Sequence, residues 1–98
     1  MEKDTSGDEE KIRAIKEQIV ALGPMRPGRL SVQYQKPKEK AGPFYQISYT
    51  IQKRSRSDYV READLERVKA ELENYQTFKR LCEELVLASL ALAKSRQR

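Results

Sequence analysis

The chain of 98 residues contains no histidine, a single cysteine (Cys82), and no glycine or proline after Pro43. The absence of histidine excludes Ser-His-Asp and Cys-His catalysis and most zinc sites. A lone cysteine excludes an intrachain disulfide and a metal site built from a cysteine cluster. We therefore predict no catalytic residue, no metal and no cofactor, and we expect the chain not to be an enzyme.

Apolar residues are also scarce, at 38% of the chain, whereas 36% of the residues are charged. No apolar run approaches the roughly 20 residues that a membrane-spanning helix needs. The acidic start, MEKDTSGDEE, lacks the apolar segment of a signal peptide. We expect a cytoplasmic binding module with a thin core, without a membrane partner or a small-molecule substrate. Its expected organisation is a disordered acidic leader over residues 1–8 and a single small α+β domain over residues 9–98.

Positive charge is concentrated in the middle of the sequence. Residues 24–61 carry nine basic and two acidic side chains, a net charge of +7, whereas the whole chain carries +5. Such a focused charge favours a polyanionic partner. The alternative is that these residues only make the surface soluble.

Helical periodicity occurs at both ends of the sequence. Isoleucine and leucine recur at steps of three and four from Ile12 to Leu22, which predicts a helix over residues 8–22 that ends at Gly23-Pro24. The same spacing from Glu62 predicts a second helix of about 35 residues, which is longer than so small a globule can cover. Either this helix breaks near residues 74–78 and folds back, or it stays whole and a partner chain covers its C-terminal half.

Several leucines of this second helix spread around more than one of its faces, so we expect a homodimer. The residues expected at its interface are Leu81, Leu85, Leu87 and Leu92.

Alternating apolar and polar residues predict strands over residues 29–34 and from residue 44 to about residue 52, with a short third strand over 56–60. Together the elements predict an α+β fold: an N-terminal helix, a three-stranded antiparallel sheet, and a long or broken C-terminal helix. One face of the sheet is expected to be the core face, formed by Leu30, Val32, Tyr34, Tyr45, Ile47, Tyr49, Ile51 and Tyr59. The other face is expected to be polar and to be joined by Arg54 and Arg56.

A small sheet of this kind can enter the major groove of DNA. We therefore predict a nucleic-acid-binding module with duplex DNA as its partner; the alternative is a protein-interaction or homo-oligomerisation module that acts through the C-terminal helix. The expected phosphate contacts are Arg29, Lys36, Lys38, Lys40, Lys53, Arg54 and Arg56. The expected base contacts are Gln46, Ser48 and Thr50.

Short motifs of the chain resemble an uncharacterised prokaryotic domain family. Its pattern is a Leu-Ser-x-Gln-Tyr strand, a cysteine-rich knuckle, Gly-Pro-Tyr-Tyr-x-Leu-Ser-Tyr, a basic turn, Tyr-Val-Pro and a helix with Asn-Tyr. The matching segments are Met25-Arg26-Pro27-Gly28, Leu30-Ser31, Gln33-Tyr34, Gly42-Pro43-Phe44-Tyr45, Ile47-Ser48-Tyr49, Tyr59-Val60 and Asn74-Tyr75.

The resemblance implies the order of the strands and a nucleic-acid or mobile-element context. The knuckle is absent here, because Gln35–Ala41 contains no cysteine. If family members bind zinc at the knuckle, this chain does not. The order of three strands and a helix is also similar to the arm-binding domains of integrases and to related plant DNA-binding domains.

Overall fold

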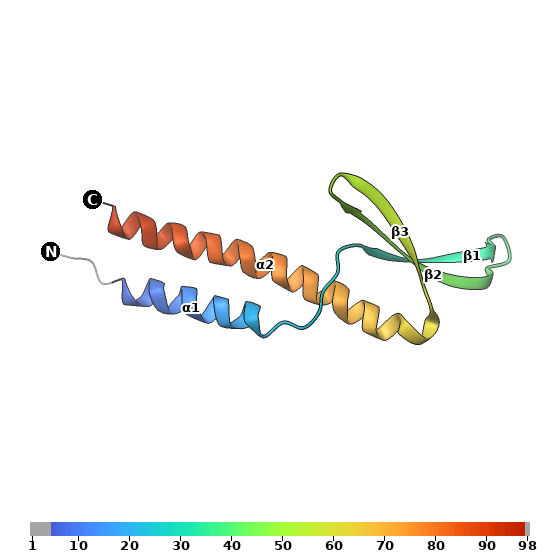
Figure 1. Ribbon diagram of the computed structural model, residues 1–98, viewed down its shortest axis with the longest axis horizontal. Coiled ribbons are helices and arrows are strands. Elements are labelled where there is room, and N and C mark those ends of the chain that lie inside the picture. Colours follow the sequence, from blue (N-terminus) through green and yellow to red (C-terminus); the bar gives the residue numbers. More distant parts are fainter. Residues whose placement is uncertain (1–4, 98) are drawn as a thin grey trace. The chain divides into compact units, whose positions relative to one another are not determined.

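The computed structural model describes residues 5–97 and shows an α+β fold (Figure 1). The elements in chain order are α1 (Ser6–Val20), β1 (Arg29–Lys36), β2 (Ala41–Ile51), β3 (Arg54–Val60), the 3-10 helix η1 (Glu62–Asp64) and α2 (Leu65–Arg96). The expected helix, antiparallel sheet and long C-terminal helix are therefore confirmed. The chain divides into two compact units, which we call the helical unit (Met1–Gly23 with Gln76–Arg98) and the sheet unit (Pro24–Tyr75).

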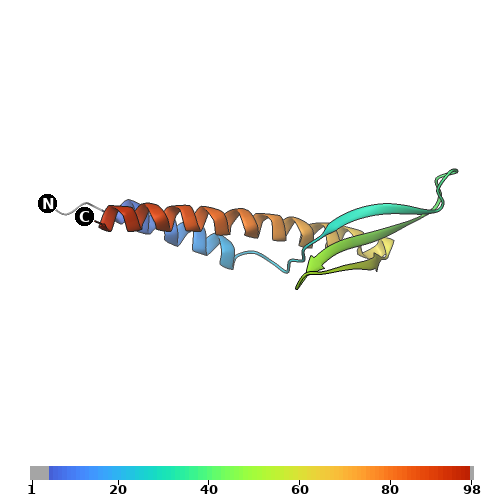
Figure 2. The same ribbon diagram turned by 90° about the horizontal axis from the view of Figure 1, so that it is seen from above.

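In the helical unit, α1 lies antiparallel to the second half of α2 (Figures 1 and 2). Ile15, Leu81 and Ala88 form its buried centre, and Ile12, Ile19, Leu22 and Leu85 pack around them. The isoleucines of α1 reach this core because a spacing of three and four places them on one helical face. An ion pair of 3.0 Å between Arg96 and Glu9 joins the far ends of the two helices.

The first helix starts earlier than the sequence predicted. It begins at Ser6, with Asp8 and Glu9 in its first turn, where carboxylates favour the positive end of the helix dipole. Of the leader expected over residues 1–8, residues 1–4 lie outside the described part of the chain, and Ser6–Asp8 are helical.

The second helix is unbroken from Leu65 to Arg96. The sequence offered a break or a partner chain as alternatives, but α1 of the same chain covers the second half of the helix instead. This corrects the surface expected for a homodimer. Leu81 is 1% exposed and Leu85 packs beside it, so neither is available to a second copy.

In the sheet unit, three antiparallel strands lie in the order β1-β2-β3. The first turns of α2 cover one face of this sheet, which we call the covered face. Its core consists of Ile47, Val60 and Val68, all less than 5% exposed, and Leu30, Tyr45, Leu65 and Leu72 pack against it. The other face has no helix of this unit on it, and we call it the open face.

The turns of the sheet are tighter than expected. Four residues, Pro37–Lys40, connect β1 to β2, whereas the strands predicted over residues 29–34 and from residue 44 leave a longer connection. Ile51 pairs directly with Arg54, so Gln52 and Lys53 alone connect β2 to β3. Both have positive φ angles, 51° and 64°, as the favoured two-residue hairpin turn requires.

This turn corrects the expected faces of β3. Directly paired residues share a face, and Arg56 pairs with Tyr49 while Arg54 pairs with Ile51, so both arginines belong to the covered face. Tyr59 pairs with Gln46 and belongs to the open face. The prediction was wrong because it assigned the faces of the third strand from the apolar character of Tyr59, whereas Val60 is the residue that the core buries.

The linker between α1 and β1 is tied to α2 within the sheet unit. The Arg26 amide donates to the Glu71 carbonyl at 3.2 Å, and Asn74 Nδ2 donates to the Pro24 carbonyl at 2.9 Å. Arg26 also forms an ion pair with Asp58 at 3.3 Å. These contacts fix the start of β1 and neutralise Asp58.

Candidate nucleic-acid interface

The open face is built from short, hydrogen-bonding side chains. The strand register places on it Arg29, Ser31, Gln33, Phe44, Gln46, Ser48, Thr50, Ser55, Ser57 and Tyr59. None of these residues is acidic, and Arg29 is the only charged one. Toward the β2–β3 turn the strands form a shallow, open depression, lined by Ser48, Tyr49, Thr50, Ser55, Arg56 and Ser57. Such a surface can meet base edges without repelling phosphates.

Part of this face is held in place by its own hydrogen bonds. Ser31 Oγ donates to the Gln46 carbonyl at 3.3 Å, and Gln33 Nε2 donates to Ser31 Oγ at 3.2 Å. Within the described residues, the side chains of Gln46, Ser48 and Thr50 form no hydrogen bond. The three side chains predicted to contact bases therefore lie together on β2, on the open face, with their hydrogen-bonding groups unused.

Basic residues gather at both ends of the sheet. Lys36, Lys38 and Lys40 surround the β1–β2 turn. At the other end of β2, Lys53 lies in the β2–β3 turn, and Arg54 and Arg56 follow it (Figure 1). The eleven residues of β2 span about 36 Å at roughly 3.3 Å per residue. The predicted phosphate contacts thus form two clusters, and Arg29 lies at the end with the β2–β3 turn, opposite Ser48.

None of these seven cations has an ion-pair partner among residues 5–97. The helices differ, because Arg13, Arg67, Lys69, Arg80 and Arg96 are all paired with a carboxylate. Unpaired surface cations keep their full attraction for an external anion. The charge of the strands is therefore available to a partner, whereas much of the helical charge is already balanced.

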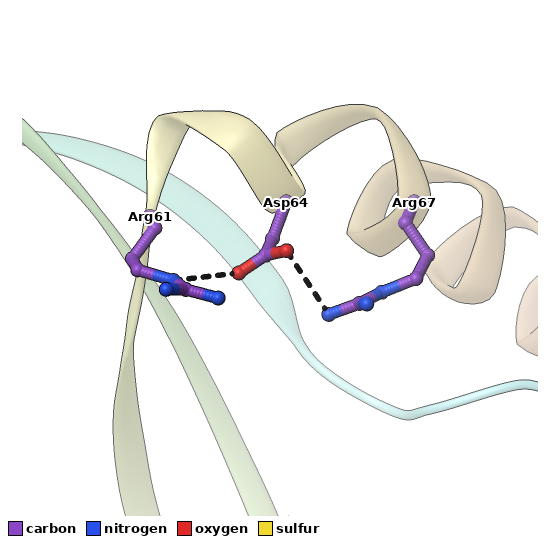
Figure 3. Close-up of polar contacts among 3 residues, drawn as sticks. All are labelled: Arg61, Asp64 and Arg67. Atoms are coloured by element: carbon purple, nitrogen blue, oxygen red, sulfur yellow. Dashed lines mark hydrogen bonds and ion pairs between the residues drawn. The ribbon is translucent and has the colours of Figure 1, made fainter.

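Arg61 is one of the basic residues that form an ion pair, although it belongs to the basic segment over residues 24–61 of the sequence. Asp64 lies between two arginines, with Arg61 Nε at 3.0 Å and an Arg67 amino group at 3.4 Å (Figure 3). This carboxylate is near the N-terminus of α2, where it also favours the helix dipole. Arg61 therefore belongs to the start of α2 and not to the basic clusters.

Sequence reasoning missed an aromatic pair on the open face. The rings of Phe44 and Tyr59 stack with centroids 5.9 Å apart at an angle of 26°. Tyr59 is 68% exposed. The sequence pattern assigned Tyr59 to the core and gave Phe44 no role. Because successive residues of a strand lie on opposite faces, the assignment of Tyr45 to the core face could have placed Phe44 on the other face.

Other kinds of site are not evident in the described residues. No group of three or more cysteine, aspartate or glutamate side chains lies close enough together to hold a metal ion. Cys82 is half-buried in α2. Within residues 5–97, no helix combines the length and the apolar character that crossing a membrane requires.

Comparison with curated proteins and with solved structures found no match. The family described as "Domain of unknown function (DUF6788)" matches residues 6–70, which is more than half of the chain. The match runs from the start of α1, through the whole sheet, to the first turns of α2. The chain therefore belongs to the DUF6788 family.

Proposed function

We propose that this chain is a non-enzymatic module that binds duplex DNA through the open face and the two basic ends of its sheet. One observation carries the proposal: all seven basic residues between Arg29 and Arg56 lack an ion-pair partner within the described residues, and no carboxylate lies on the open face between them. Phosphate contacts would position the sheet, and Gln46, Ser48 and Thr50 would contact base edges.

The dimensions of the sheet support this partner. Three strands about 4.8 Å apart span roughly 10 Å between the outer strands, and the major groove of B-DNA is about 12 Å wide. The major groove winds once around the duplex in about 10 base pairs, so a straight strand of about 36 Å can follow it over only part of a turn. Clusters at both ends of such a strand can reach phosphates on both sides of the contacted bases. The family resemblance adds a prokaryotic, mobile-element context to the proposal, and the proposed location is the cytoplasm.

The test is a titration of a 20-base-pair duplex at several salt concentrations. If about five cations meet phosphates, the slope of log affinity against log salt should be about −4 to −5. Replacing the lysines around the β1–β2 turn, Lys36, Lys38 and Lys40, with Gln should weaken binding and reduce the steepness of the slope by up to about 3.

A matched control removes the same charge elsewhere. Lys11, Arg13 and Lys16 are exposed basic residues of α1, in the helical unit. Their triple replacement by Gln should leave the slope almost unchanged. Equal losses in the two triple variants would show that only net charge matters, and an absence of salt-sensitive binding to any nucleic acid would refute the proposal.

A second candidate function is self-association through α2, because its outer face remains apolar. Val86, Leu87 and Leu90 are 58%, 60% and 50% exposed. At 100° per residue they lie on the side of the helix opposite Leu81 and Ala88, which face α1. Of the leucines originally expected at a dimer interface, only Leu87 belongs to this stripe.

Charge complementarity supports a second copy of the chain as the partner that covers this stripe. Glu83 precedes Leu87 by four residues, and Lys94 follows Leu90 by four residues. In an antiparallel pair with Leu87 against Leu90 of the second copy, Glu83 would therefore lie against Lys94 of that copy, as two-fold symmetry allows. Both side chains are without an ion-pair partner among the described residues.

Charge reversal tests this pairing directly. Lys94→Glu should place like charges at both ends of the seam and shift the protein toward a single-chain mass in sedimentation equilibrium. Adding Glu83→Lys should restore the dimer. A wild-type protein that has a single-chain mass at micromolar concentration, or a double variant that fails to recover, would reject this arrangement.

A further inference from the structure

We propose that Phe44, Gln46 and Tyr59 form a contact site for an A·T base pair at one end of the sheet. This inference rests on the proposed function, and it names the bases that the open face prefers. An aromatic pair with one exposed ring lies beside an unused amide on a surface that is otherwise polar, and this juxtaposition requires an explanation.

The strand register brings the three side chains together. Gln46 lies directly opposite Tyr59 on the neighbouring strand, and Phe44 lies two residues before Gln46 on the same face. The Phe44 and Tyr59 rings are in contact, with centroids 5.9 Å apart. An amide and an apolar ring edge are therefore presented side by side to whatever meets the open face.

The exposure of Tyr59 distinguishes this pair from the other aromatic residues of the sheet. Tyr34, Tyr45 and Tyr49 belong to the covered face and are half-buried, whereas Tyr59 is 68% exposed. A large aromatic surface left in water gains free energy when a partner covers it. The pair is thus the most hydrophobic point of a face that is otherwise hydrophilic.

An A·T pair presents the complementary groups in the major groove. The thymine methyl is the apolar group there, and it takes contacts from apolar side chains such as Phe. Adenine presents the N7 acceptor and the N6 donor, which a Gln amide can contact at both positions. A G·C pair offers no methyl group, so the same three side chains would leave an aromatic edge without a partner.

Neighbouring groups are consistent with this site. Gln33 lies opposite Phe44, but its amide already donates to Ser31, so Gln46 is the glutamine available for a base. The lysines of the β1–β2 turn follow β1 at the same end and can hold the adjacent phosphates. The preference for A·T is therefore expected at the end of the footprint that this turn contacts.

The geometry favours a paired base over an unpaired one. Single-strand binding surfaces stack successive bases on separate aromatic rings. Here the two rings stack on each other at an angle of 26°, and no other aromatic residue in the described part of the open face continues the row. The pair offers an edge for a methyl group and not a platform for a series of bases.

The experiment compares two 20-base-pair duplexes of mixed A·T sequence, one with thymine and one with deoxyuridine at every thymine position. Deoxyuridine removes only the methyl groups, so the wild-type affinity should fall by about fourfold for each methyl contacted. The Tyr59→Ser variant should bind both duplexes with nearly equal affinity. Ser57→Ala, a change on the same face two residues away, should retain the wild-type difference.

The outcomes separate this inference from the proposed function. Salt-dependent binding that is identical for the two duplexes would overturn the A·T site and leave DNA binding standing. Tighter, Tyr59-dependent binding of the single strand of the same sequence would also overturn it, because the rings would then stack on unpaired bases. Loss of all salt-dependent binding would refute both. Thermal unfolding of each variant checks that the sheet remains folded.

Discussion

Gly28 shows how a single residue can control the start of the sheet. Its φ angle is +133°, a region that residues with a side chain rarely adopt. A Cβ atom at this position would lie 2.8 Å from the Ser48 carbonyl oxygen and 2.9 Å from Ile47 Cγ1. Both partners belong to β2, the central strand, so they cannot move without disturbing the buried core of the sheet unit.

We therefore expect Gly28→Ala to lower the free energy of unfolding by about 2–4 kcal/mol, from backbone strain together with the clash. Denaturant titration measures this change. Gly7→Ala is the matched control, because Gly7 lies in α1 with nothing within 4 Å of an added Cβ. That substitution should stabilise the protein by up to about 1 kcal/mol, since alanine favours a helix. Similar effects of the two changes would contradict the role assigned to Gly28.

At the scale of elements, the spacing of apolar residues predicted both helices and the first two strands. The three-and-four spacing in both helices and the alternation in β1 and β2 identified these elements, because each buries one face. The turn between β2 and β3 was not predictable from its residues. Gln52 and Lys53 adopt positive φ angles without the Asn-Gly or Asp-Gly pair that signals such a turn.

The wrong prediction for the β2–β3 connection also affected the residues expected at the candidate site. The faces of β3 depend on which of its residues pair with β2 across the turn, and Ile51 pairs with Arg54. The prediction assigned the faces from the apolar character of Tyr59 instead, so the expected faces of Arg54, Arg56 and Tyr59 were exchanged. The face of Gln46, Ser48 and Thr50 was predicted correctly, because these residues alternate with the apolar residues of an easily recognised strand. The element that covers the second half of α2 was also not predictable, because packing α1 against it is a tertiary contact that no local sequence pattern indicates.

At the scale of the whole molecule, residues 5–97 form two separate hydrophobic cores. One forms around Ile15 and Leu81 in the helical unit, and the other around Ile47 and Val68 in the sheet unit. α2 contributes to both, because the two compact units meet along its sequence between Tyr75 and Gln76. The single domain predicted over residues 9–98 requires these two cores to unfold together.

Truncating one residue in each core tests this cooperativity. Ile15→Ala should destabilise the helical unit by about 2–4 kcal/mol, because it removes buried methyl groups and leaves a cavity. Val68→Ala is the equivalent change beneath the sheet.

Amide hydrogen exchange measured by mass spectrometry reports the local stability of each unit. Because none of the residues grouped in either core is shared with the other, we expect Ile15→Ala to accelerate exchange in α1 while β2 keeps its protection, and Val68→Ala to do the reverse. If Ile15→Ala lowers the protection of β2 as much as that of α1, the two cores form one cooperative domain, and DNA binding by the sheet would then depend on the integrity of the helices.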